Sequence, residues 1–184
     1  MRARVQDSVL FVIDVQEGRC PIVDNPRKVI FNCARLLRGA SMFGIPAVVT
    51  ELCPDIFGPV MPDLRDLLSD HRPVARRALS CLADQDEHSV ATRLAGKAVR
   101  SVIVGGVEAH VSVLQTVLDL LAADYRVFVV SDACSSRHAD EEQVAMARMQ
   151  ALGCQIITTE MLLFEWVGTE DSPVFRTLMD SLIR

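Results

Sequence analysis

The chain has 184 residues, half of them hydrophobic and 23% charged, and a formal net charge of −5. A chain of this length and apolar content is expected to fold as one domain over 1–184, and its composition excludes a disordered chain. The acidic balance offers no positive surface for nucleic acid, and no apolar run is long enough to span a membrane. We therefore expect neither a nucleic acid nor a membrane as partner.

Short apolar segments alternate with helical patterns along the whole chain. The segments rich in valine and isoleucine predict six strands: Val9 to Asp14, Ala47 to Glu51, a weak one at Pro73 to Ala75, Ser101 to Gly105, Val127 to Asp132 and Gln155 to Thr159. Helical periodicity predicts helices at Pro26 to Phe43, Val60 to Leu68, Glu87 to Ala98, Val111 to Ala123, Asp140 to Leu152, Met161 to Val167 and Val174 to Ile183. This alternation predicts an α/β fold with a doubly wound parallel sheet.

In a sheet of this kind, ligands bind outside the carboxyl ends of the strands. We expect Asp14, Glu51, the turn after Gly105 and Asp132 to approach one crevice there. The glycine-rich motifs that bind dinucleotides or ATP phosphates are absent, so no cofactor is expected.

Ser112 follows a predicted strand and a glycine turn, and it lies at the first turn of an apolar helix. Unpaired backbone N–H groups and the positive end of the helix dipole stabilise an anion at such a position. Hydrolases place a nucleophile there, so Ser112 is a candidate catalytic residue.

The stretch GGVEAHVSVLQTVLDLL, followed by VVSDACSSR, resembles the signature of the isochorismatase-like cysteine hydrolases. The isochorismatase-domain-containing proteins are the most similar group, and some similar trypanosomatid proteins are labelled mitochondrial-associated ribonucleases. The resemblance extends from SVLFVIDVQE through VVTELCPDIFG and RPVARRALS to ITTEMLLFEWV. It implies a three-layer architecture with strand order 3-2-1-4-5-6, and homo-oligomers are common in the family.

The resemblance also implies a catalytic triad of aspartate, lysine and cysteine, and this chain keeps only the first of the three. Asp14 takes the position of the aspartate, Arg76 that of the lysine in a K-T-x-F-S motif, and Ser112 that of the nucleophilic cysteine. Spacing alone allows another interpretation of Asp14, because an aspartate after a strand often caps a loop or helix.

The two departures weaken the same chemical step. A guanidinium can hold an anion but cannot shuttle a proton, and a serine hydroxyl needs a stronger base than a thiol does. An aspartate with a pKa of about 3.9, lowered further by the neighbouring Arg76, is a poor base for Ser112. We therefore expect a weak or inactive hydrolase that retains a small-ligand pocket.

Two further residues are candidates for ligand binding. The backbone N–H groups of Glu108 and Ser112 match those that form the family's oxyanion hole, and the family has a cis peptide at the position of Val107 and Glu108. His110 is expected to line the pocket or a subunit contact. Activation of Ser112 by the His110 imidazole stays open as an alternative.

Other functions remain as alternatives. An active serine-based hydrolase of small amides or esters is one, and a ribonuclease is another that the acidic charge and 5% aromatic content disfavour. The four histidines show no ligand spacing, so no metal is expected. The six cysteines are expected to be reduced and mostly structural, and a reactive role for Cys134 is the less favoured alternative. A cytoplasmic location is the default, and import into mitochondria stays open.

Overall fold

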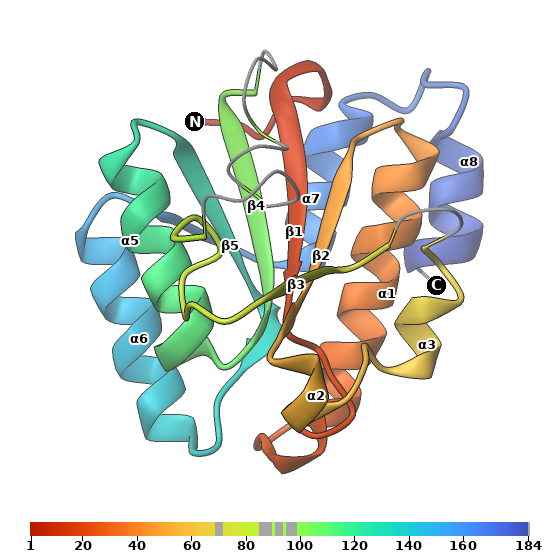
Figure 1. Ribbon diagram of the computed structural model, residues 1–184. Coiled ribbons are helices and arrows are strands. Elements are labelled where there is room, and N and C mark those ends of the chain that lie inside the picture. The colour runs from red at the N-terminus through yellow and green to blue at the C-terminus, as the bar shows by residue number, and fades with distance from the viewer. Residues whose placement is uncertain (69–71, 85–89, 91–93, 95–98, 184) are drawn as a thin grey trace.

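The computed structural model describes residues 1–68, 72–84, 90, 94 and 99–183. Its centre is a six-stranded sheet in the order β3-β2-β1-β4-β5-β6, in which all neighbouring strands are parallel (Figure 1). The strands are β1 (Ser8–Ile13), β2 (Ala47–Leu52), β3 (Val74–Arg76), β4 (Ser101–Val107), β5 (Arg126–Ser135) and β6 (Gln155–Ile157). The predicted α/β class and strand order are confirmed.

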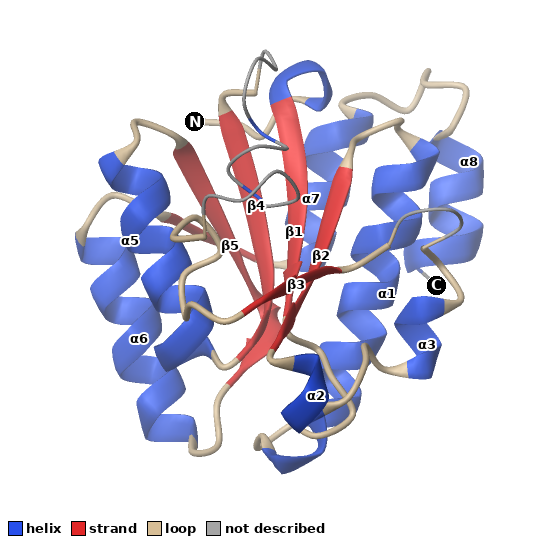
Figure 2. Cartoon of the chain, viewed as in Figure 1, coloured by secondary structure: helices blue, strands red, loops and turns tan. Residues whose placement is uncertain are grey.

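Helices cover both faces of this sheet (Figure 2). One layer holds α1 (Pro26–Met42), α7 (Thr159–Val167) and α8 (Phe175–Leu178), and the other holds α5 (Leu114–Ala122) and α6 (Ala139–Ala151). Along β1, Leu10 and Val12 pack toward α1 and α7, whereas Phe11 and Ile13 pack toward α5. Because side chains alternate across a strand, an apolar run such as that of β1 is buried on both faces.

β4 and β5 extend further than the sequence pattern predicts. β4 continues through Gly106 to Val107, and its register with β5 shifts between Val104 and Gly106. Gly106 has a φ of +133°, and a Cβ there would lie 2.1 Å from the carbonyl oxygen of Ile13. Only glycine permits this close approach, which brings the end of β4 against the end of β1.

Several connections differ from the predicted elements. The helix expected over Val60 to Leu68 is reduced to α3 (Pro62–Arg65), because Val60 pairs with Gln16 in a β-bridge. A short helix, α2 (Pro54–Phe57), precedes it and was not predicted.

The helix expected over 87–98 lies almost wholly outside the described residues. None of the described helices is long and apolar enough to cross a membrane.

Candidate active site

The three residues at the triad positions gather at the carboxyl edge of the sheet, at the bottom of Figure 1. Asp14 directly follows β1, Arg76 is the last residue of β3, and Ser112 lies in a π-helical turn, η3 (Ala109–Val113), between β4 and α5. Asp14 and Ser112 are fully buried, and Arg76 is 4% exposed. The site is therefore closed to solvent in this conformation.

Asp14 is held by the backbone and by two side chains. Its φ of 54° lies in the left-handed region, which aspartate tolerates better than most residues, and its backbone N–H donates to the carbonyl of Thr50. The Thr50 hydroxyl donates to Oδ1 over 2.8 Å, and Nη2 of Arg76 donates to Oδ2 over 2.5 Å. Both carboxylate oxygens are thus already engaged within the protein.

The Arg76 guanidinium is committed to protein acceptors as well. Besides Nη2, its Nη1 donates to the backbone carbonyls of Ala78 and of Leu79, the latter over 3.0 Å. Within the described part of the chain, Nε is buried without a hydrogen-bond partner. The side chain is 1% exposed, so the guanidinium acts mainly as the internal counter-ion of Asp14.

Burial raises the pKa of the Asp14 carboxyl above its ordinary value. The charge of Arg76 and the hydroxyls of Ser112 and Thr50 lower it, but desolvation is the larger effect. The expectation that the guanidinium would leave Asp14 with a lowered pKa is therefore wrong. The physical reason is the complete removal of the carboxylate from water, which the sequence did not reveal.

Ser112 occupies the nucleophile position, with its hydroxyl beside the Asp14 carboxyl. Its Oγ lies near enough to Asp14 to lower the pKa of that carboxyl, yet it has no hydrogen-bond partner among the described residues. Its backbone carbonyl accepts a hydrogen bond of 2.7 Å from Thr116 of α5. The structure thus brings Asp14, Arg76 and Ser112 together, with the Ser112 hydroxyl beside a carboxylate whose two oxygens already accept from Thr50 and Arg76.

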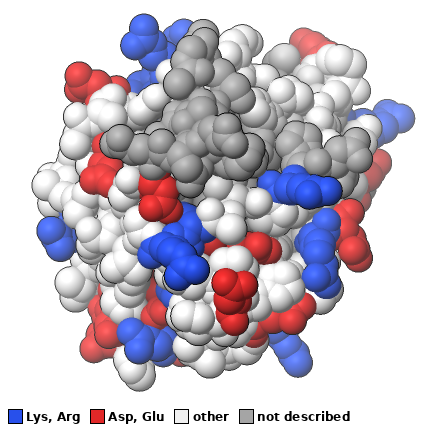
Figure 3. Space-filling model, viewed as in Figure 1, with Lys and Arg blue, Asp and Glu red and all other residues white. Residues whose placement is uncertain are grey.

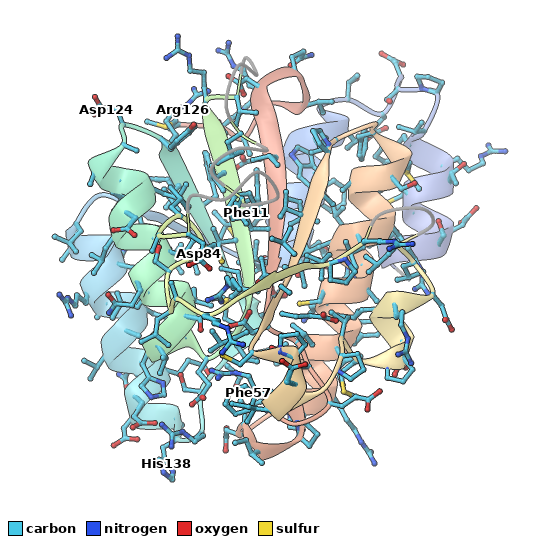
Figure 4. The ribbon with its side chains drawn as sticks, viewed as in Figure 1. Phe11, Phe57, Asp84, Asp124, Arg126 and His138 are labelled. Carbon is cyan, nitrogen blue, oxygen red and sulfur yellow. The ribbon has the colours of Figure 1, made fainter. Side chains whose placement is uncertain are left out.

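Glu108 precedes η3 and follows a cis peptide bond from Val107. Its carboxylate is bound by Arg19 over 3.1 Å and by Arg137 over 2.6 Å. The Arg19 side chain is 8% exposed and packs over the ring of Phe57, whereas that of Arg137 is half exposed. Phe57 and the start of α6 both lie at this edge of the sheet (Figure 4).

His110 is near the site but does not face the candidate nucleophile. Its Nδ1 lies 2.9 Å from the hydroxyl of Ser136, and its Nε2 lies 3.4 Å from the carboxylate of Glu141. No contact joins the imidazole to Ser112 among these interactions. The alternative of a histidine-activated serine therefore gains no support from the geometry.

The other residues expected at the crevice have structural partners. Glu51 accepts a hydrogen bond from the backbone N–H of Val60, and Asp132 accepts two from Thr159 at the start of α7. Cys134 is 1% exposed, and burial raises the pKa of its thiol. These contacts account for the polar positions without a catalytic role.

Sequence reasoning missed the residues that hold the site in place. Thr50 binds Asp14, and Gln16 ties the end of β1 to Leu52 and Gly58 through three hydrogen bonds of 2.7–3.1 Å. A buried glutamine or threonine gives no periodic signal of its own. Only the parallel register of β1 with β2 brings Thr50 beside the end of β1.

A pocket of about 430 Å³ opens beside this cluster. Its lining includes Cys53 and Asp55 near α2, the chain from Ala75 to Arg77, and Asp84. Acidic and basic side chains are interspersed over the described part of the face in Figure 3, without a continuous basic stripe. Among the described residues, no three histidine, cysteine, aspartate or glutamate side chains gather as a metal site.

Comparisons with known proteins agree on one family. The model of the isochorismatase domain matches residues 8–161. The human isochorismatase domain-containing protein 2 is 36% identical over 172 residues, which cover 93% of this chain and 80% of that protein.

Solved structures extend the likeness to the fold. The structure described as MAR1 ribonuclease from Caenorhabditis elegans is 33% identical, covers 100% of this chain and 92% of its own, and has a TM-score of 0.90. An octameric hydrolase of unknown specificity from Escherichia coli shares the fold at 24% identity, with a TM-score of 0.90 over 100% of this chain and 91% of that one. This chain belongs to the isochorismatase domain family, and its fold is that of the isochorismatase-like hydrolases.

Proposed function

We propose that this protein is a weak or inactive hydrolase of the isochorismatase fold that still binds a small molecule at the carboxyl edge of its sheet. One observation carries the proposal. Both oxygens of Asp14 are engaged by Arg76 and Thr50, while the hydroxyl of Ser112 has no hydrogen-bond partner among the described residues. A serine nucleophile needs a free base within hydrogen-bond reach, and the carboxylate beside Ser112 already has both oxygens engaged.

The raised pKa of Asp14 does not remove this obstacle. A more basic carboxylate accepts a proton more readily, but transfer to Asp14 would leave Arg76 as a buried cation without its counter-ion. An unpaired buried charge costs several kcal/mol, roughly 3–5 when a buried pair is broken. The ion pair therefore opposes the proton transfer on which attack by Ser112 depends.

The ligand we propose is a small molecule bound at the pocket beside Arg76 and Arg77. The exposed side chain of Arg77 and the carboxylates of Asp55 and Asp84 give this pocket both signs of charge. A small polar amide or ester suits such a mixed lining better than a purely apolar ligand does. Glu108 and His110 remain candidate binding residues on the other side of the cluster.

Turnover of small amides and activated esters tests the proposal. The protein as given, Ser112→Ala and the double variant Arg76→Lys/Ser112→Cys are compared on one panel. We expect no turnover above background from the first two and measurable turnover from the double variant, which restores the family's triad. Turnover by the given protein that Ser112→Ala abolishes would instead establish an active serine hydrolase.

The likeness to the C. elegans MAR1 structure favours a second candidate, RNA cleavage. The net charge of −5 and the interspersed surface charges oppose it, because RNA binding needs a positive groove along the backbone. RNA cleavage that persists through extensive purification and disappears with Asp14→Ala would support it. Cleavage that Asp14→Ala leaves unchanged would point to a contaminating nuclease.

We also propose that the protein is a homo-oligomer, as the E. coli protein of the same fold is described as octameric. Light scattering after size exclusion tests this. A mass above the 20.3 kDa of one chain is expected. A single species at that mass would contradict it.

A further inference from the structure

A pocket of about 420 Å³ opens at the amino edge of the sheet, opposite the triad positions. Its lining comes from residues 1–6, from Arg126 at the start of β5, and from Glu165 and Trp166 near the end of α7. Figure 4 shows Arg126 at the top of the sheet, whereas His138 lies at the bottom, where the triad residues gather. The pocket therefore shares no residue with the candidate active site.

The N-terminal part of this lining is anchored to the rest of the domain. Ala3 is 1% exposed and belongs to the apolar core on the side of α1 and α7. Its backbone N–H donates to Oε2 of Glu165 over 2.7 Å, which ties the segment to α7. Arg2 and Arg4 flank this fixed point in the chain, so both are held at the pocket.

Three arginines make this pocket positive in a chain whose net charge is −5. Arg126 is neutralised by an ion pair with Asp7. Arg2 and Arg4 are exposed and have no ion-pair partner among the described residues. Glu165 is the one acidic side chain in the described lining, and it already accepts a backbone hydrogen bond. The unpaired guanidiniums therefore favour an anion as the occupant of the pocket.

Trp166 supplies a hydrogen-bond donor that the protein leaves unused. The residue is 5% exposed, and its Nε1 is enclosed without a hydrogen-bond partner in the described part of the chain. The six-membered ring of the indole packs on α1, where a Cβ at Gly39 would lie 3.4 Å from Cζ3. Nε1 is on the opposite side of the indole from Cζ3, and no described residue of α1 lines the pocket. The indole N–H can only donate, so its burial beside the pocket calls for an acceptor there.

We propose that this pocket binds the phosphate group of a small phosphate monoester. Arg2 and Arg4 form ion pairs with the phosphate, and Nε1 of Trp166 donates a hydrogen bond to one of its oxygens. The site lies at the opposite edge of the sheet from Asp14 and Ser112. The inference therefore goes beyond the proposed function, and its test does not depend on turnover at that other site.

Charge, geometry and size favour a phosphate monoester over other anions. Guanidinium groups bind both carboxylates and phosphates, but a phosphate monoester carries a charge of about −1.5 to −2 at pH 7, which matches the two unpaired guanidiniums. Its three terminal oxygens point in different directions, as donors from the N-terminal segment and from α7 require, whereas the two oxygens of a carboxylate lie in one plane. A volume of about 420 Å³ falls in the range of small-molecule sites, roughly 300–1,000 Å³, and leaves room for an organic group beside the phosphate.

Titration of the unaltered protein with inorganic phosphate and with glycerol phosphate tests the inference. Trp166 is the single tryptophan of the chain, so tryptophan fluorescence reports on this pocket alone, and calorimetry measures the same binding without the fluorophore. We expect saturable binding of glycerol phosphate by both methods and no saturable change with potassium chloride at equal ionic strength. Absence of saturable binding of both phosphates overturns the inference.

The double variant Arg2→Gln/Arg4→Gln tests the charged partners. Both side chains are exposed, so the fold should be retained, and the Kd for glycerol phosphate should rise about tenfold or more. The matched control is Arg27→Gln/Arg65→Gln, which removes two exposed arginines of α1 and α3 that lie outside the lining. The control should leave the Kd unchanged. Equal Kd values for the two double variants overturn the inference.

Trp166→Phe tests the neutral donor, because phenylalanine keeps an aromatic ring and removes the N–H. Calorimetry should show binding of glycerol phosphate weakened about tenfold, and an unchanged Kd would overturn the role of the indole. Two further ligands test the chemical class. Succinate that binds as tightly as glycerol phosphate would overturn the assignment of phosphate, and tighter binding of inorganic phosphate would overturn the monoester in favour of the free ion.

Discussion

Asp14 and Arg76 form a buried ion pair with 2.5 Å between Oδ2 and Nη2, and their side chains are 0% and 1% exposed. The pair joins the ends of β1 and β3, which lie on either side of β2 in the sheet. It therefore fixes two of the three triad positions relative to each other. It also occupies Oδ2 of the carboxylate, while the Thr50 hydroxyl donates to Oδ1.

Loss of one member of this pair should destabilise the fold. Arg76→Ala leaves Asp14 as an uncompensated buried charge, and we expect the free energy of unfolding to fall by about 3–5 kcal/mol. The matched control is Arg65→Ala, whose partner Glu17 lies 3.9 Å away with both side chains about half exposed. That change should cost less than about 1 kcal/mol in the same urea titration. Equal losses of unfolding free energy in the two variants would show that the buried pair stabilises the fold no more than the exposed pair does.

The raised pKa of Asp14 predicts a pH dependence of stability. The folded state binds this proton more tightly than the unfolded state, where the ordinary value is 3.8. The contribution of Asp14 to stability is therefore complete below the unfolded pKa and is lost as the pH rises through the folded pKa. The unfolding free energy of the unaltered protein, minus that of Asp14→Asn, should fall as the pH rises above the ordinary pKa of 3.8. A difference that increases with pH would mean that the attraction of Arg76 outweighs burial.

Two buried hydroxyls of the site should respond oppositely to truncation. Ser112→Ala removes a hydroxyl that has no hydrogen-bond partner among the described residues, so stability should stay equal or rise by about 1 kcal/mol. Thr50→Val removes the hydroxyl bound to Asp14 and should cost about 1–3 kcal/mol. Thermal or urea unfolding measures both. A large loss of stability in Ser112→Ala would reveal a partner for Oγ.

The Glu108 carboxylate should matter more than its exposed partner. Glu108→Gln leaves Arg19, 8% exposed, without its counter-ion, and we expect a loss of about 3–5 kcal/mol. Arg137→Gln changes only a half-exposed side chain and should cost less than about 1 kcal/mol. Similar losses in both variants would contradict the assignment of Arg19 as the dominant partner.

The sequence alone determined the architecture, because burial on both faces of a parallel sheet requires continuous apolar strands. The segments VLFVI and VFVV carry that signal locally, and helices of matching length separate them. The same reasoning located Asp14 at the rim of the sheet and Ser112 at a helix start. It made α3 too long, since the β-bridge at Val60 depends on Gln16, which is 44 positions away in the chain.

Only the tertiary structure decided which residues of the candidate site form hydrogen bonds with one another. Thr50 reaches Asp14 because β1 and β2 pair in parallel, and Cys81 reaches Thr50 because the chain after β3 returns across the sheet. Hydrogen bonds between such distant residues depend on register and loop path, which leave no periodic trace in the sequence. The burial of Asp14 also depends on the tertiary structure. Burial raises the pKa of its carboxyl by more than the charge of Arg76 lowers it.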